Sequence, residues 1–164
     1  MDAFVRVAVV SDLNKSPMGR LHTRVNDRNV SIIQTEDGIY CMDSVCSHMG
    51  GPLAVGDIED LAGEKVIKCP WHSYRFSLKD GKKFSKPVSF DPKSGCPILH
   101  EWKKSDEVYQ RVHEVKLDDS DGGIYVKLNL NDETEHPSDR YAYDNNAAAC
   151  MNTACSQYFH SKRY

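Results

Sequence analysis

Two short segments of this chain each hold one cysteine and one histidine, and this matched pair constrains the fold more than any other feature. One residue separates Cys46 from His48, and two residues separate Cys69 from His72. Thiolate sulfur and imidazole nitrogen are common protein ligands of zinc and iron. A centre that uses all of these side chains requires the two segments to lie side by side. We therefore expect a fold that carries two neighbouring loops at one tip.

The donors match the ligand set of a [2Fe–2S] cluster in which one iron binds two cysteines and the other binds two histidines. Cys46 and Cys69 would bind the inner iron, and His48 and His72 the outer, solvent-facing iron. A structural zinc ion is the main alternative, because zinc accepts the same donors. Zinc fingers, however, usually pair cysteine with cysteine and histidine with histidine in their local spacings. Since each segment here supplies one of each, the pattern favours the cluster.

The sequence around these ligands resembles the two cluster-binding boxes of the Rieske family, C-x-H-x-G-x-x-L and C-P-x-H, as residues 46–53 and 69–72 show. In the respiratory and photosynthetic branch a second cysteine in each box forms a disulfide, but here Gly51 and Trp71 hold those positions. The chain is therefore more similar to soluble Rieske-type ferredoxins and to the Rieske domains of oxygenases. Residues 58–64 and 82–107 also resemble the eukaryotic Rieske domain-containing proteins, and the similarity extends over about residues 3–130.

This resemblance implies a soluble ferredoxin that carries single electrons between a reductase and an acceptor, with an oxygenase as one candidate acceptor. The partner surface would surround the outer histidines and comprise Met49, Gly50, Gly51, Pro52, Trp71 and Ser73. Tyr74 and Phe76 replace the serine and tyrosine donors of the respiratory branch, so we expect a reduction potential of about −150 mV, near the low end for such clusters. Trp71 is expected to shield the cluster from water or to pack in the core.

Two other kinds of function are weighed against the electron carrier. A terminal oxygenase needs a second iron, usually held by two histidines and a carboxylate, but after residue 130 only His136 and His160 remain, with no such motif. We therefore expect no catalytic site in this chain. A structural or sensing module, stabilised by the cluster or by zinc, is the remaining alternative. Reversible reduction with electron delivery to an acceptor would argue against it.

Alternating apolar residues predict an all-β chain: an antiparallel barrel-like or sandwich Rieske fold with a small inserted cluster-binding subdomain at about residues 43–82. The expected strands are residues 4–10, 21–25, 30–35, 39–42, 66–69, 74–77, 109–117 and 124–130. Apolar residues within 82–107 are expected to pack on the base, with a partner surface as the alternative: Phe84, Phe90, Ile98, Leu99 and Trp102. The Rieske domain is expected to span residues 1–130, followed by a flexible tail at 131–164. Within that tail, tyrosines at 141, 143 and 158 and Phe159 are candidates for docking onto the domain, and residues 147–156 for a short helix.

Composition sets the remaining expectations. A net charge of −3 without a basic stripe argues against nucleic acid binding, and no apolar run approaches the roughly 20 residues of a membrane span. The N-terminus lacks the features of a signal peptide, so we expect a cytoplasmic protein. We also expect it to be a monomer. The cysteines outside the boxes are expected to bind no metal: Cys41, Cys96, Cys150 and Cys155. Cys41 is expected to be buried, and the thiols of Cys150 and Cys155 in the tail to be free, with a regulatory disulfide between these two as the alternative. Histidines outside the boxes are expected to be surface or hydrogen-bonded residues: His22, His100, His113, His136 and His160.

Overall fold

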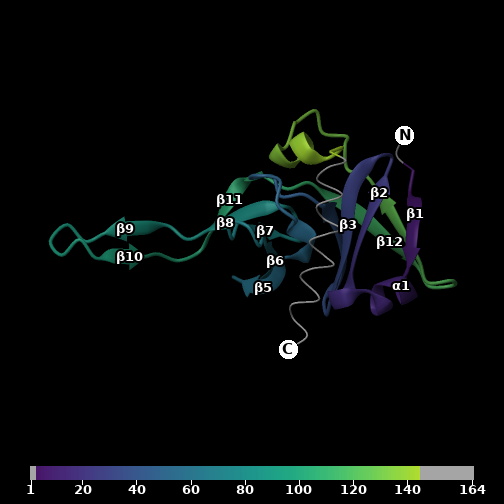
Figure 1. The fold of residues 1–164 in the computed structure, drawn as a ribbon, viewed down its shortest axis with the longest axis horizontal. Coiled ribbons are helices and arrows are strands. Elements are labelled where there is room, and N and C mark those ends of the chain that lie inside the picture. The colour runs from purple at the N-terminus through teal and green to yellow at the C-terminus, as the bar shows by residue number, and fades with distance from the viewer. Residues whose placement is uncertain (1–2, 145–164) are drawn as a thin grey trace.

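The computed structural model describes residues 3–144 and has two antiparallel sheets that pack into one barrel-like body (Figure 1). The larger sheet has six strands in the order β1-β13-β12-β4-β3-β2. Its strands are β1 (Val5–Val9), β2 (Arg20–Val25), β3 (Arg28–Thr35), β4 (Gly38–Asp43), β12 (Val112–Asp118) and β13 (Gly123–Lys127). The predicted all-β class is therefore confirmed.

The smaller sheet lies between β4 and β12 in the chain and has the order β11-β8-β7-β6-β5. Its strands are β5 (Asp57–Leu61), β6 (Glu64–Lys68), β7 (Arg75–Ser77), β8 (Lys82–Ser85) and β11 (Lys103–Val108). The first predicted loop precedes β5, and the second connects β6 to β7. Since β6 and β7 pair directly, the sheet itself fixes where the second loop begins and ends.

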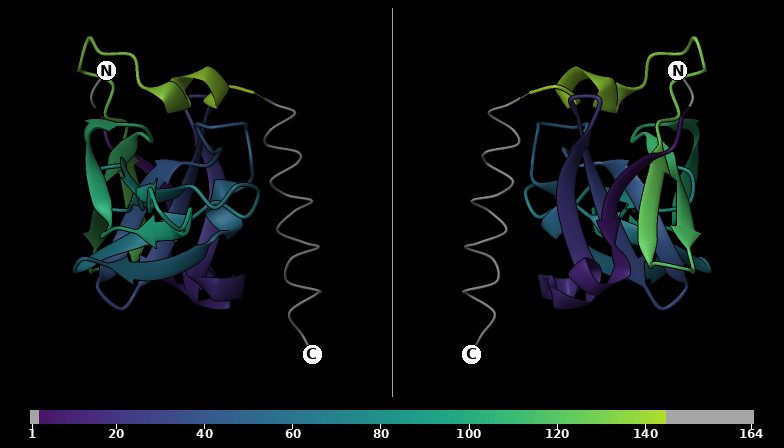
Figure 2. Two further views of the ribbon diagram at one scale, coloured as in Figure 1. Left: turned by 90° about the vertical axis from the view of Figure 1, so that its left-hand side faces the viewer. Right: turned by 90° about the vertical axis from the view of Figure 1, so that its right-hand side faces the viewer.

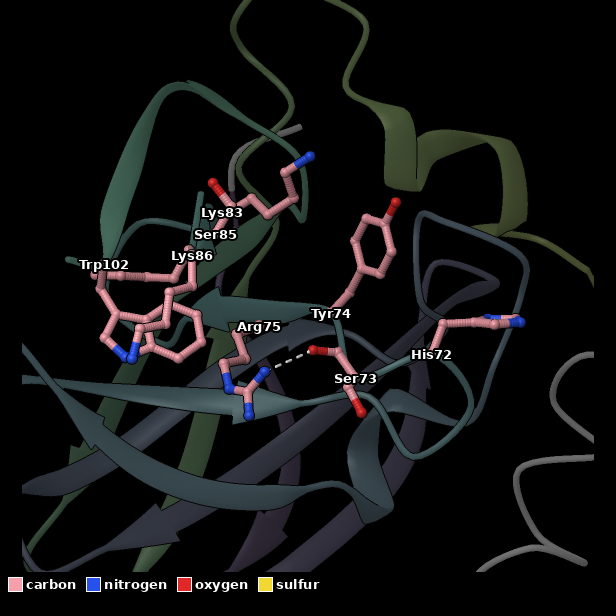
Figure 3. A pocket seen from close by; sticks show the side chains of 9 residues that line it. His72, Ser73, Tyr74, Arg75, Lys83, Ser85, Lys86 and Trp102 are labelled. Carbon is pink, nitrogen blue, oxygen red and sulfur yellow. Dashed lines mark hydrogen bonds between the residues drawn. The ribbon is translucent and has the colours of Figure 1, made fainter. Parts of the chain in front are cut away.

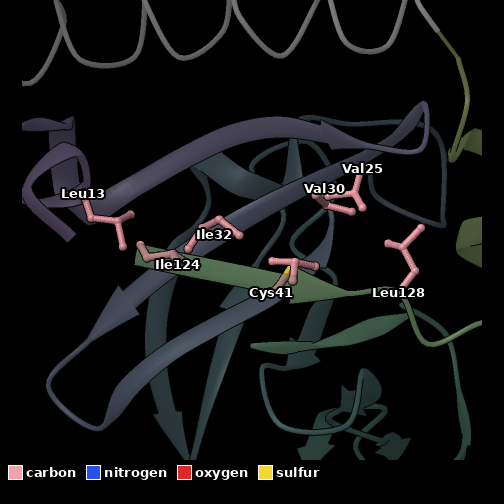
Figure 4. Close-up of a cluster of buried hydrophobic side chains, with 8 residues drawn as sticks. Leu13, Val25, Val30, Ile32, Cys41, Ile124 and Leu128 are labelled. Atoms are coloured by element: carbon pink, nitrogen blue, oxygen red, sulfur yellow. The ribbon is translucent and has the colours of Figure 1, made fainter. Parts of the chain in front are cut away.

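Two cores hold the body together. The first core lies against the six-stranded sheet and is drawn in Figure 4; it comprises Leu13, Val25, Val30, Ile32, Cys41, Ile124, Val126 and Leu128. The second core joins the two sheets and comprises Ile33, Met42, Cys46, Leu53, Ile67, Cys69, Phe76 and Leu78. Cys41 is buried, as predicted. The second core also contains both box cysteines, so the packing of the fold itself brings the two loops together.

The predicted strands of the six-stranded sheet agree with the structure within a few residues. A two-residue turn at Asn26 and Asp27, with φ of 48° and 65°, joins β2 to β3, in the conformation that suits a tight hairpin. The strand predicted at 109–117 begins instead at Val112. Tyr109 and Gln110 donate their backbone N–H groups to Gly81 O, outside the sheet. The sequence reading also missed a short helix, α1 (Val10–Lys15), and two 3₁₀ turns, η1 (Pro17–Gly19) and η2 (Leu53–Val55).

The segment between β8 and β11 forms a projecting arm, which Figure 1 shows extending far from the body. Two short strands, β9 (Val88–Phe90) and β10 (Pro97–Leu99), pair only with each other in the described part of the chain. The expectation that this segment packs on the base was wrong for Phe90 and Leu99, which are 67% and 65% exposed. It holds for Phe84 at the root of the arm, which is 5% exposed. The packing of Phe90 and Leu99 was predicted wrongly because apolar residues normally indicate burial.

The first part of the predicted tail is anchored to the domain. A 3₁₀ turn, η3 (Pro137–Tyr141), lies across one end of the body (Figure 2). Ser138 is fully buried and donates its hydroxyl hydrogen to Asp43 at 2.5 Å, and Asp139 pairs with Arg28 and Arg111. The tail prediction is therefore corrected for this stretch, since buried ionic partners fix it. The helix predicted at 147–156, Cys150 and Cys155 lie outside the described residues.

No helix within residues 3–144 is long and apolar enough to cross a membrane.

Candidate metal centre

The structure brings the two predicted loops together, and their backbones are built alike. In the first loop Cys46 N–H donates to Gly51 O at 2.9 Å, and Gly50 N–H donates to Cys46 O at 3.0 Å. In the second loop Cys69 N–H donates to Tyr74 O at 2.7 Å, and Ser73 N–H donates to Cys69 O at 3.0 Å. Each cysteine therefore closes its own loop through both of its backbone groups. This arrangement fixes where the thiols and the following histidines lie.

The two thiols lie together in the second core. Cys46 and Cys69 are each 1% exposed, and their side chains are hydrogen-bonded to each other. The hydrogen bond from Cys46 lowers the pKa of the Cys69 thiol to about 7, and the same contact raises the pKa of Cys46 well above its ordinary value. The Cys69 thiol can therefore lose its proton near neutral pH, and the thiolate is the form that binds a metal.

Backbone N–H groups surround each sulfur in the same pattern. Those of His48 and Met49 hydrogen-bond Cys46, and those of Trp71 and His72 hydrogen-bond Cys69. Such bonds stabilise negative charge on sulfur, and in iron–sulfur proteins they help to set the reduction potential.

The two histidines stand next to each other at the outer edge of the loops. The ring centroids of His48 and His72 are 4.8 Å apart, with the planes at 88°. His72 is exposed, whereas His48 is half-buried with its Nδ1 atom fully enclosed. That Nδ1 atom has no hydrogen-bond partner within residues 3–144. A buried nitrogen left unpaired costs about 1–3 kcal/mol, so the position of this atom fits a metal ligand.

An aromatic ring holds His48 in place, a contact the sequence reading missed. The Tyr74 ring stacks on the His48 ring with centroids 4.0 Å apart and planes at 13°. The Lys83 ammonium lies 5.2 Å from the Tyr74 ring centroid and 4.4 Å from that of Tyr109. The sequence analysis considered Tyr74 only as the replacement for a serine hydrogen-bond donor, because the box motif says nothing of stacking. The structure gives this residue a second role, which is to fix the imidazole plane.

A buried glutamine holds the first loop, and no sequence motif predicts this role. Gln110 is fully buried; its side-chain oxygen accepts the Ser47 N–H at 3.0 Å. Its side-chain nitrogen donates to the carbonyl oxygens of Asp43 and Val45, at 2.9 and 2.8 Å. These bonds satisfy polar backbone groups on both sides of Cys46. Gln110 therefore orients the loop without reaching the donor atoms.

A buried charge network lies beneath the same loop. The Asp43 carboxylate is enclosed, and Arg28 donates to both of its oxygens at 2.7 Å. His113 Nε2 lies 3.1 Å from the same carboxylate. Burial by itself would raise the pKa of Asp43, but hydrogen bonds with His113 and Arg28 outweigh it and hold the pKa below its ordinary value. Paired in this way, the carboxylate supports the loop and is not free to bind a metal.

A basic cleft opens beside His72. Figure 3 shows the labelled side chains of this cleft, whose volume is about 380 Å³. Its lining residues come from the second loop, β7, β8 and the root of the arm: His72, Ser73, Tyr74, Arg75, Lys83, Phe84, Ser85, Lys86 and Trp102. Arg75 pairs with Glu59 at 2.6 Å, and its guanidinium lies 4.8 Å from the Trp102 ring centroid. Since Arg75 is paired with Glu59, the positive charge on the open side of the centre comes from Lys83 and Lys86.

Histidines outside the boxes have other partners, as expected. A side-chain oxygen lies within hydrogen-bond distance of a ring nitrogen in His22, His100, His113 and His136. His160 lies outside the described residues. Cys96 is exposed on the arm, away from the loops. Trp71 is 55% exposed beside Gly51, so its ring covers the outside of the loops and does not belong to the core.

Comparison with known proteins relates this arrangement to one family. A family model described as soluble Rieske-type ferredoxin matches residues 5–131. A human Rieske domain-containing protein is 38% identical over 131 residues, which are 80% of this chain and 78% of that protein. The ferredoxin component of naphthalene 1,2-dioxygenase/salicylate 5-hydroxylase systems from Ralstonia is 30% identical over 71 residues, 43% of this chain and 64% of that protein.

A solved structure shares the fold. The ferredoxin of carbazole 1,9a-dioxygenase from Nocardioides aromaticivorans superposes with a TM-score of 0.52 at 22% identity, over 76% of this chain and 97% of that protein. At this level of identity the likeness concerns the fold alone.

Proposed function

We propose that this chain, which belongs to the soluble Rieske-type ferredoxins and is an electron carrier rather than an enzyme, holds one [2Fe–2S] cluster with Cys46, His48, Cys69 and His72. When bound, such a cluster accepts and releases one electron. The observation that carries the proposal is the matched pair of loops, each of which offers one buried thiol and one imidazole nearer the surface.

The residues present fit the group. The adjacent thiols of Cys46 and Cys69 can both reach one iron. Four backbone N–H groups around the sulfurs can stabilise the negative charge of the thiolates. On the outer side, the unpaired Nδ1 of His48 is a ready nitrogen donor. Since His72 is the exposed member of the set, electrons would enter and leave past its ring.

A single zinc ion fits less well. Zinc in a structural site takes four protein ligands around one point. No group of three or more histidine, cysteine, aspartate or glutamate side chains within residues 3–144 is arranged to hold one metal ion. A [2Fe–2S] cluster needs only two protein ligands at each iron. The separation of the thiol pair from the imidazole pair therefore favours the cluster.

Metal and sulfide analysis tests this proposal. We expect protein purified without oxygen from iron-replete cells to be red-brown, with two irons and two acid-labile sulfides per chain, the content of a [2Fe–2S] cluster. Stoichiometric zinc without sulfide would refute the cluster. A cluster that is present but cannot be reduced reversibly would instead support the structural or sensing module.

Ligand variants test the residues one iron at a time. Cys46→Ser and Cys69→Ser should lose most of the cluster, because an alkoxide is a poor substitute for a thiolate. His48→Cys and His72→Cys should keep an altered cluster of lower potential, because added negative charge favours the oxidised state. His22→Cys, outside the boxes, is the matched control and should leave the spectrum unchanged. A His48 or His72 variant with both the native spectrum and the native potential would show that the histidine is not a ligand.

The partners are proposed from the relatives. We infer a reductase as donor and an oxygenase as one acceptor, since relatives of this chain are ferredoxin components of dioxygenase systems. We further infer a monomer with a Rieske domain at residues 1–130 and cluster-binding loops within 43–82. A cytoplasmic location is supported by the thiols of Cys41 and Cys96, which form no disulfide within residues 3–144, as is usual in reducing compartments. Fluorescence microscopy of the tagged protein and sedimentation analysis test the location and the monomer.

A further inference from the structure

The arm presents an apolar face with nothing packed on it in the described part of the chain. In an antiparallel pair, residues opposite each other point to the same side, and so do residues two apart in one strand. Val88 pairs with Leu99 and Phe90 pairs with Pro97, so these four side chains share one face. Val88 is 49% exposed, and Phe90 and Leu99 are more exposed still. An isolated two-stranded ribbon is only marginally stable in water, and a contiguous exposed apolar face marks an interaction site.

The arm is continuous with the basic cleft beside His72. Lys86 and Trp102 line the cleft at the root of the arm, and Figure 3 shows them on the far side of Tyr74 from His72. Among the described residues, Lys83 and Lys86 make no salt bridge, and no carboxylate lines the cleft. A local excess of positive charge on a chain of net charge −3 favours a negatively charged partner surface at this place.

We propose that the arm and the cleft together dock a redox partner protein whose surface carries carboxylates beside an apolar patch. The carboxylates enter the cleft and pair with Lys83 and Lys86, while the apolar patch covers Phe90 and Leu99. The proposal rests on the proposed function and specifies the partner of the same site. Docking in this way places the partner against the exposed ring of His72, which lines the cleft itself.

The size of the apolar face favours a transient partner over a second copy of this chain. Stable protein pairs bury about 1,200–2,000 Å² in total, whereas weak redox encounters bury less. Four side chains of the arm supply only a few hundred Å², on the scale of roughly 150–250 Å² for one fully buried aromatic residue. The face can therefore guide a brief encounter but is too small to hold a lasting dimer.

Electron transfer to a defined surface tests the proposal. Gold electrodes carrying a mixed layer of carboxylate- and methyl-terminated thiols reproduce the proposed partner chemistry, and amine-terminated layers reverse its charge. The variants are the double substitution Lys83→Glu with Lys86→Glu, and the double substitution Phe90→Ser with Leu99→Ser. Matched controls are Lys116→Glu and Leu117→Ser, which are exposed on β12 in the larger sheet.

For Lys83→Glu with Lys86→Glu, the expected result is a loss of about tenfold in the electron-transfer rate at the mixed layer, at the scale of electrostatic steering. Phe90→Ser with Leu99→Ser should also lower this rate, because it removes apolar contact with the methyl groups, and the controls should leave the rate unchanged. At the amine layer the Lys83→Glu, Lys86→Glu variant should become faster than the native protein. Equal rates for both double variants and the native protein would overturn the proposal. So would sedimentation that shows a dimer split by Phe90→Ser with Leu99→Ser, because a second copy would then occupy the arm.

The electron-carrier function and the docking surface can be refuted separately. If dithionite does not reversibly reduce the native protein, the electron-carrier function fails. If the native protein is reduced reversibly but its rate ignores every substitution in the arm and the cleft, only the docking surface fails.

Discussion

Replacement of Gln110 should weaken the first loop although this residue holds no metal. Gln110→Met keeps the side-chain length but removes three buried hydrogen bonds, to Ser47 N–H and to the carbonyl oxygens of Asp43 and Val45. A net contribution of about 1 kcal/mol per hydrogen bond gives a loss of about 3 kcal/mol in the free energy of unfolding. For a chain of this size, that corresponds to a fall in the melting temperature of about 10 °C.

The assay follows two signals during heating: circular dichroism of the backbone and visible absorbance of the cluster. Both midpoints should fall together in Gln110→Met, because the glutamine holds the loop that carries Cys46 and His48. Gln34→Met, at a half-buried position on β3, is the control and should shift neither midpoint by more than a few degrees. If Gln110→Met melted within about 2 °C of the native protein, the loss in free energy of unfolding would be less than about 1 kcal/mol. The role of these hydrogen bonds would then be refuted.

Three further results are expected. Gly51→Ala should lower cluster occupancy, because the added Cβ would lie 3.0 Å from the Cys69 sulfur; iron analysis per chain checks this, and full occupancy would contradict it. Arg28→Met should destabilise the fold by about 3–5 kcal/mol in urea, since it leaves the Asp43 carboxylate buried without its main partner; a loss below 1 kcal/mol would show that the carboxylate finds another. Because the folded-state pKa values of Asp43 and Asp139 lie below the ordinary 3.8, their stabilisation is present above that pH and is lost as the pH falls through the folded-state values. The free energy of unfolding should therefore drop below about pH 4, and less steeply in Asp139→Asn; equal slopes would contradict this.

The parts of the molecule that follow from local patterns could be predicted from the sequence. The proposed ligands were identified because iron–sulfur chemistry needs particular residue types at particular spacings, and the strands of the larger sheet because their apolar residues alternate. Gln110 could not be identified, since its role depends on carbonyl groups more than 60 residues away in the chain. The arm was predicted wrongly because its local pattern suggested burial that does not occur. Phe90 and Leu99 are apolar residues typical of a core, and only the three-dimensional structure shows that both are exposed, with nothing from residues 3–144 packed over them.

The burial of Cys46 and Cys69 also affects how the protein acquires its cluster and how long it keeps it. Both thiols belong to the packed interior that joins the two sheets, and only the histidine side is open. A preassembled cluster can therefore reach the sulfurs only while the loops are parted, either before folding is complete or during a rare local opening. The same opening would release the cluster, so loading and loss both require the loops to part. Survival of the holoprotein is then a kinetic property of the loops, set by how seldom the interior opens.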